Sequence, residues 1–178
     1  MHDLMRLYAG EQAGRTLDPD ELRQAVDRLL EQYLNRARVA DAALNALAGQ
    51  VAGKGFADRA AALVWFDAER LSLVAAVSTG LQTGRHWLAA DLAAYLGEYL
   101  AWRRHLEDRL TVYSVALACM REVGDRRGEG SAWNNLGLAL RQVRRFEEAI
   151  AAHEQAAAIF EAFGDDYNRG IAPGEPGQ

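Results

Sequence analysis

The stretch WNNLGLALRQVRRFEEAIAAHEQAAAIFEAFGD, residues 133–165, decides the fold, because an earlier part of the chain carries a related pattern. A shift of 40 residues places leucines, glycines and a Gly-Asp pair on residues of the same type: Leu96 on Leu136, Gly97 on Gly137, Leu100 on Leu140, and Gly124-Asp125 on Gly164-Asp165. Shared helical composition alone does not produce matches at the same phase of two helices and at the turn between them. The sequence therefore predicts helix hairpins repeated in series.

Small and large residues alternate in the second copy as a close-packed hairpin requires. Gly137 and Ala149 let two helices approach, while Trp133, Leu136 and Leu140 fill the seam between them. This order resembles the tetratricopeptide repeat. The chain departs from that family with Leu140 at a usual tyrosine, His153 at a usual aromatic position and Glu161 at a usual proline. Its period is also longer than the standard ~34 residues.

Helix signals extend in both directions from this hairpin. Asp18-Pro19 opens a long helix running towards Leu47, and glycines at 80 and 84 end a second helix near Thr79. The remaining helices are expected at about 87–100, 106–123, 131–143 and 146–163, the first of them with Trp87 on the same apolar face as its leucines. We expect an all-α fold of antiparallel helix hairpins stacked as a short tetratricopeptide-like α-solenoid.

The expected organisation has five parts. The first part is an N-terminal helix at 1–16, residues 17–89 are connecting long helices with a degenerate repeat, and residues 90–129 and 130–169 are the two repeats. Pro173 and Pro176 leave residues 170–178 as a disordered tail. A repeat array normally needs a polar capping helix, which is missing after the second repeat, so the sequence also suggests a fragment of a longer protein.

Composition narrows the classes of partner. The net charge is −5, which argues against direct binding of nucleic acid. No apolar run is long enough for a membrane span and no signal peptide is visible, so we expect a cytoplasmic protein. Cys119 is the only cysteine, falls on an apolar helix face and is expected to be a buried thiol.

The start of the chain, Met1-His2-Asp3-Leu4-Met5-Arg6-Leu7-Tyr8-Ala9, resembles the MHD motif that closes the winged-helix part of NB-ARC ATPases, the nucleotide switches of the STAND class. In actinobacterial relatives a long helix, a segment similar to residues 65–71 and then tetratricopeptide repeats follow in this order. The resemblance implies that His2 would contact nucleotide phosphates in a full-length relative, while without a nucleotide domain it would only start a helix.

Catalytic patterns are absent from the sequence. Residues 49–55 are one residue too short for a P-loop and lack its Ser/Thr, so ADP or ATP would be bound only by an additional upstream domain. The four histidines have no metal-ligand spacing, and acidic pairs such as Glu147-Glu148 are suited to helix starts. We therefore expect no enzyme activity and no cofactor in this chain.

A binding surface is the remaining candidate site. In stacked hairpins the first helix of each pair lines a concave groove, which places Asn134, Leu138 and Arg141 in it and Asn135 beside it. Asparagine amides can bind a peptide backbone and an arginine its carboxylate, although the same residues could simply be solvated. We expect a protein or peptide partner, no nucleic-acid or membrane contact, and weak self-association through exposed apolar ends.

Two functions are compatible with this surface. The first is the repeat arm of a STAND-type nucleotide-switched transcriptional regulator, which binds a ligand or partner and thereby controls the nucleotide domain. The alternative is a free-standing tetratricopeptide adaptor that bridges protein partners.

Overall fold

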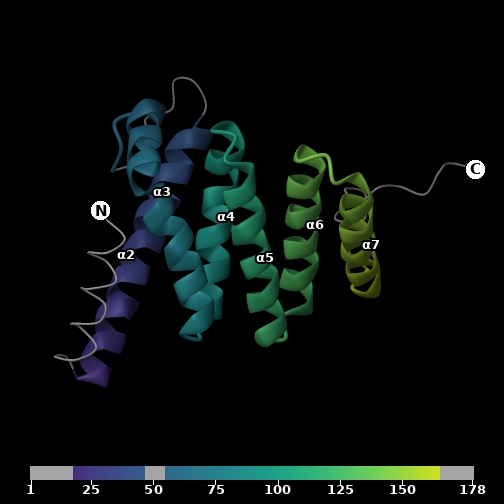
Figure 1. Ribbon diagram of the computed structural model, residues 1–178, viewed down its shortest axis with the longest axis horizontal. Coiled ribbons are helices and arrows are strands. Elements are labelled where there is room, and N and C mark those ends of the chain that lie inside the picture. The colour runs from purple at the N-terminus through teal and green to yellow at the C-terminus, as the bar shows by residue number, and fades with distance from the viewer. Residues whose placement is uncertain (1–17, 47–54, 165–178) are drawn as a thin grey trace, which may run out of the picture.

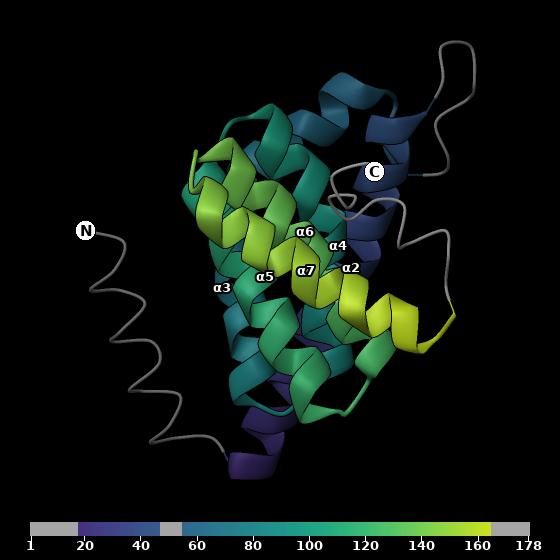
Figure 2. The same cartoon turned by 90° about the vertical axis from the view of Figure 1, so that its right-hand side faces the viewer.

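The computed structural model describes residues 18–46 and 55–164, and all regular structure in these ranges is helical. Six helices follow one another along an elongated molecule (Figure 1), and Figure 2 views it from the α7 end. Their bounds are α2 Pro19–Asn45, α3 Arg59–Gln82, α4 His86–Trp102, α5 Leu106–Glu122, α6 Arg126–Gln142 and α7 Phe146–Ala162. The expected all-helical class is confirmed.

Aspartates begin three of the helices. The side chain of Asp18 accepts a hydrogen bond from the Asp20 amide, with Pro19 in the first turn, as the sequence predicts. Asp58 caps α3 by accepting a hydrogen bond of 2.8 Å from the Ala61 amide. Asp125 caps α6 in the same way. These bonds satisfy amide groups that lack partners inside the helix.

The last four helices recur at regular intervals. α4 and α6 begin 40 residues apart, as do α5 and α7, and all four contain 17 residues. The turns also recur at regular intervals. A residue with positive φ occurs every 20 residues, at Gly84, Arg104, Gly124, Arg144 and Gly164. A left-handed residue at this place closes the helix by letting a later amide bond back to its last turn, as His105 N–H does to Leu100 O at 2.9 Å.

Among the described helices, each of α2 to α5 packs on at least two others, whereas α7 packs closely on α6 only. α2 packs on α3 and α4, and α3 packs on α4 and α5. The core there includes Leu30 and a stacked pair of rings, Phe66 and Tyr99, with centroids 4.6 Å apart. α6 packs on α5 and α7, whereas no Cα of α6 comes within 8 Å of α4 and none of α7 within 8 Å of α5. The closest backbone approach between the α6–α7 hairpin and the other described helices is therefore made by α6.

Two helix boundaries differ from those expected, and glycine is the reason in both. α6 begins at Arg126 rather than near Ser131. Its Gly130 permits close packing, since a Cβ there would lie 3.0 Å from Ile159 Cγ2. α3 continues past Gly80 to Gln82. A Cβ on Gly80 would lie 2.8 Å from the Cβ of Ala89, so this glycine lets α3 and α4 pack closely. These glycines allow helices to approach each other and do not end them.

Several sequence expectations concern residues outside the described ranges. They are the helix at 1–16 with His2, the loop at 49–55 except for residue 55, and the tail at 170–178. The expected helix 146–163 and the burial of Cys119 lie inside and are confirmed, with the cysteine inaccessible on α5.

Candidate functional site

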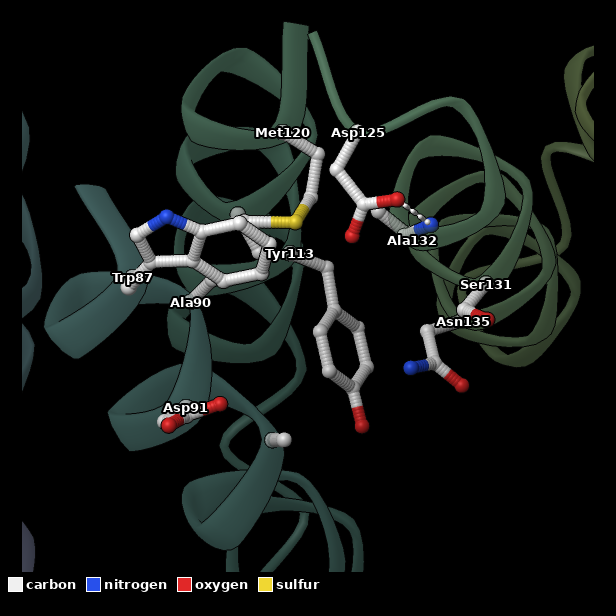
Figure 3. Close-up of a pocket in the computed structure, with 12 residues that line it drawn as sticks. Trp87, Ala90, Asp91, Tyr113, Met120, Asp125, Ser131, Ala132 and Asn135 are labelled. Carbon is white, nitrogen blue, oxygen red and sulfur yellow. Dashed lines mark hydrogen bonds between the residues drawn. The ribbon is translucent and has the colours of Figure 1, made fainter. Parts of the chain in front are cut away.

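A pocket opens between α4 and α6, over the carboxyl-terminal half of α5 (Figure 3). It exists because α6 packs on α5 while no Cα of α6 comes within 8 Å of α4. Its volume is about 250 Å³, and the lining residues are Trp87, Ala90, Asp91, Ala94, Tyr113, Ala116, Met120, Asp125, Gly128, Ser131, Ala132 and Asn135. This volume is below the roughly 300–1,000 Å³ of small-molecule sites, so the pocket fits one protein side chain better than a whole cofactor.

The α4 wall carries Trp87 and Asp91. They are four residues apart on one helix and therefore share a face. The indole of Trp87 is 56% exposed, so the sequence expectation that it lies on the packed face with the leucines is wrong. Asp91 makes no hydrogen bond or ion pair with any residue that the structure describes. Partial desolvation by its apolar surroundings raises the pKa of Asp91 above its ordinary value.

The floor of the pocket comes from α5. Tyr113 and Met120 are both about 5% exposed, and their side chains lie between the two walls in Figure 3. The Tyr113 hydroxyl lies against the Gly97 backbone, where a Cβ would stand only 1.8 Å away. Burial raises the pKa of Tyr113, so the phenol is neutral. The floor is therefore apolar and rigid, with a single hydroxyl group at its edge.

The α6 wall carries Asp125, Ser131 and Asn135. The carboxylate of Asp125 accepts a 3.0 Å hydrogen bond from the Gly128 amide, the dashed line in Figure 3. The Ser131 hydroxyl donates to the Arg127 carbonyl at 3.3 Å. The Asn135 amide is half-buried and has no hydrogen bond to the described part of the chain. Asn135 can therefore offer both a donor and an acceptor to a ligand.

The predicted groove residues separate in the structure. Asn135 lines the pocket, whereas the Asn134 Oδ1 is 3.0 Å from His153 Nδ1 on α7 and so lies within the α6–α7 hairpin. Leu138 is half-buried and Arg141 is exposed, and neither lines this pocket. Whether any of the four contacts a peptide stays a prediction.

Sequence reasoning did not identify Trp87 and Asp91 as site residues. The available signal was an acidic residue one turn after a tryptophan, in a helix with few other charges. That signal is weak without the neighbouring helices, because the pocket is created by α6 standing away from α4.

A second pocket, of about 560 Å³, lies between α5 and α7 over α6. Two of its charged lining residues, Arg145 and Glu148, pair with each other through two hydrogen bonds of 2.6 Å. The indole Nε1 of Trp133, which lines this pocket, is buried without a partner in the described chain. We favour the smaller pocket as the candidate site because it combines an exposed ring with unpartnered polar side chains.

Cys119 and His153 are both buried, and burial shifts the pKa of each. Burial raises the pKa of Cys119 to about 11, which keeps its thiol protonated and unreactive. Desolvation, followed by the charge of Arg141, lowers the pKa of His153. Residues 18–46 and 55–164 contain no group of three or more side chains arranged to hold a metal ion. None of their helices combines the length and apolar character needed to cross a membrane.

Comparisons with protein-family models, with proteins of described function and with solved structures find no match to this chain.

Proposed function

We propose that this chain is a non-catalytic protein-interaction scaffold that binds an extended segment of a partner protein in the α4–α6 pocket. The observation that carries the proposal is an exposed indole at Trp87 above an apolar floor, together with polar groups at Asp91 and Asn135 that have no partner in the described ranges. Protein interfaces are typically anchored by such aromatic side chains, with polar groups around them that fix orientation.

The regular helix spacing supports the finer architecture. Helices and left-handed turn residues recur with the 40-residue period that the sequence contains, as a tetratricopeptide-like solenoid requires. In such a solenoid α4 and α6 would be the first helices of consecutive hairpins, and the pocket would belong to the concave surface. Binding there would place the partner across two repeats.

The wider context of the proposal is the repeat arm of a STAND-type transcriptional regulator in the cytoplasm, with no direct nucleic-acid or membrane contact. It rests on the resemblance at residues 1–9, which lie outside the described ranges. Reading the coding DNA upstream tests it. An open frame with a true P-loop supports the regulator, whereas a nearby stop codon favours the alternative, a free-standing adaptor.

Peptide selection tests the binding function directly. The purified chain is panned against a phage-displayed library of random dodecapeptides, and enriched peptides are synthesised and measured by fluorescence polarisation. We expect Trp87→Ala to weaken binding at least tenfold. Trp102→Ala is the matched control, because this indole is 45% exposed on the same helix but outside the pocket. Failure to enrich any peptide, or equal loss in both variants, would overturn the proposal.

Self-association remains a weaker proposal. Phe146 and Ile150, one turn apart on α7, are each about half exposed, as is Phe163 just after that helix. These side chains could meet a second copy or a following helix. Sedimentation velocity at rising concentration distinguishes a monomer from a weak oligomer.

A further inference from the structure

We propose that the α4–α6 pocket binds an arginine side chain of the partner, with the guanidinium paired to the Asp91 carboxylate and lying against the Trp87 indole. This inference rests on the proposed function and names the chemistry of the segment that would be bound.

Charge is the first argument. The twelve lining residues include two carboxyl groups and no lysine, arginine or histidine. Asp125 already accepts a backbone hydrogen bond, whereas Asp91 has no partner among the described residues. Asp91 is exposed at the pocket wall, its apolar surroundings raise its pKa by partial desolvation, and no cation among the described residues pairs with it. A positively charged group is the ligand that would restore the stability of this carboxylate.

A related arrangement on α6, in which the carboxylate precedes the ring along the helix instead of following it, holds an arginine. On α6, Glu129 and Trp133 are also four residues apart, and together they hold Arg121 of α5. The Arg121 Nε is 2.9 Å from a Glu129 oxygen, and its guanidinium carbon is 5.0 Å from the Trp133 ring centroid. Trp87 and Asp91 form a similar ring-and-carboxylate pair on α4, without an arginine.

Arginine suits this pair better than lysine does. Its planar guanidinium can donate two parallel hydrogen bonds to a carboxylate while stacking on an aromatic ring. The apolar floor of Tyr113 and Met120 can accept the methylene part of the side chain. Asn135 on the opposite wall remains available for the backbone of the bound segment.

The test is a nuclear magnetic resonance titration of the full chain, ¹⁵N-labelled, with N-acetyl-arginine amide. N-acetyl-citrulline amide is the comparison ligand, because citrulline has nearly the same shape without the charge. The readouts are the Trp87 indole N–H and the backbone amides of 87–94 and 131–135. The Asp91→Asn variant removes the charge at an exposed position, and Glu107→Gln is the control, an exposed carboxylate on α5 outside the pocket. Circular dichroism and the dispersion of the spectra verify that each variant is folded.

We expect arginine amide to shift the pocket resonances with at least fivefold higher affinity than citrulline amide. Asp91→Asn should weaken arginine binding about tenfold and leave citrulline unchanged, while Glu107→Gln should have no effect. Equal binding of the two ligands, no effect of Asp91→Asn, or no shift of the pocket resonances would overturn the arginine assignment.

The two proposals fail in different ways. Library peptides that bind through Trp87 but carry no arginine, and that tolerate Asp91→Asn, would remove the arginine assignment and leave the peptide-binding function. Arginine amide bound at the pocket, with no dodecapeptide enriched from the library, would support the arginine site and remove the peptide-binding function.

Discussion

Replacing Gly137 with alanine tests whether the α6–α7 hairpin depends on a close contact with His153. The structure places the imidazole directly on this glycine, so that a Cβ at position 137 would stand 2.8 Å from both Cε1 and Nε2. The ring has little freedom to move away, because it is 7% exposed and its Nδ1 is 3.0 Å from the Asn134 side chain. Two effects of the substitution oppose each other.

Helix propensity favours alanine over glycine by about 1 kcal/mol in a helix interior. Overpacking a core typically costs about 1–3 kcal/mol, and disturbing the bond between the His153 and Asn134 side chains adds roughly 1 kcal/mol. The two unfavourable effects together exceed the gain in helix propensity, so Gly137→Ala is expected to destabilise the fold by about 1–3 kcal/mol. In a chain that already carries His153→Ala the obstruction is gone, and Gly137→Ala should stabilise it by about 1 kcal/mol.

A double-mutant cycle measures the difference between these two backgrounds. Urea unfolding followed by circular dichroism gives the free energy of unfolding of each of the four proteins, and the coupling should be about 2–4 kcal/mol. Additive effects, or a stabilising Gly137→Ala in the presence of His153, would refute the reasoning that the ring is held against this glycine.

Three further outcomes follow from local geometry. Gly97→Ala should destabilise the chain by roughly 2 kcal/mol in thermal unfolding because of the Tyr113 hydroxyl, and Tyr113→Phe should recover about half of the loss, since the ring carbon behind the hydroxyl also lies close. Arg144→Gly should stabilise it by about 0.5–1 kcal/mol in urea, because Arg144 has a φ of 65° that glycine adopts without strain. Burial and the Arg141 charge lower the pKa of His153, so the unfolded chain binds the extra proton first on acidification. Stability should be complete above about pH 6.5 and fall below it, with a smaller slope in His153→Ala.

The helices and their spacing were accessible from sequence because they depend on local signals. Asp18 with Pro19, and Asp58, cap helices through contacts with the next few residues only. The Gly124-Asp125 pair ends one helix and begins the next. Glycine was the main source of error. Gly80 and Gly130 suggest breaks in a sequence, but both lie inside helices whose neighbours require a position without a side chain.

The candidate site was predicted only in part, for a related reason. The chemistry of the Asn134-Asn135 pair is visible in the sequence, yet the two side chains face different neighbours, His153 and the pocket. Adjacent residues on a helix differ by about 100° in direction, so a small error in the assumed helix phase or partner exchanges their roles. The sequence prediction placed Asn134 in the groove and Asn135 beside it, whereas Asn135 lines the pocket and Asn134 faces His153.

The sequence by itself determined an all-helical chain with a 40-residue recurrence, because caps, turns and apolar spacing act over a few residues. Only the tertiary structure decided that α6 stands away from α4, that Trp87 is exposed and that Asp91 lacks a partner among the described residues. Burial and pairing depend on which side chains of other helices approach a residue. That information is distributed over the packing of α4, α5 and α6 and is contained in no single segment of the chain.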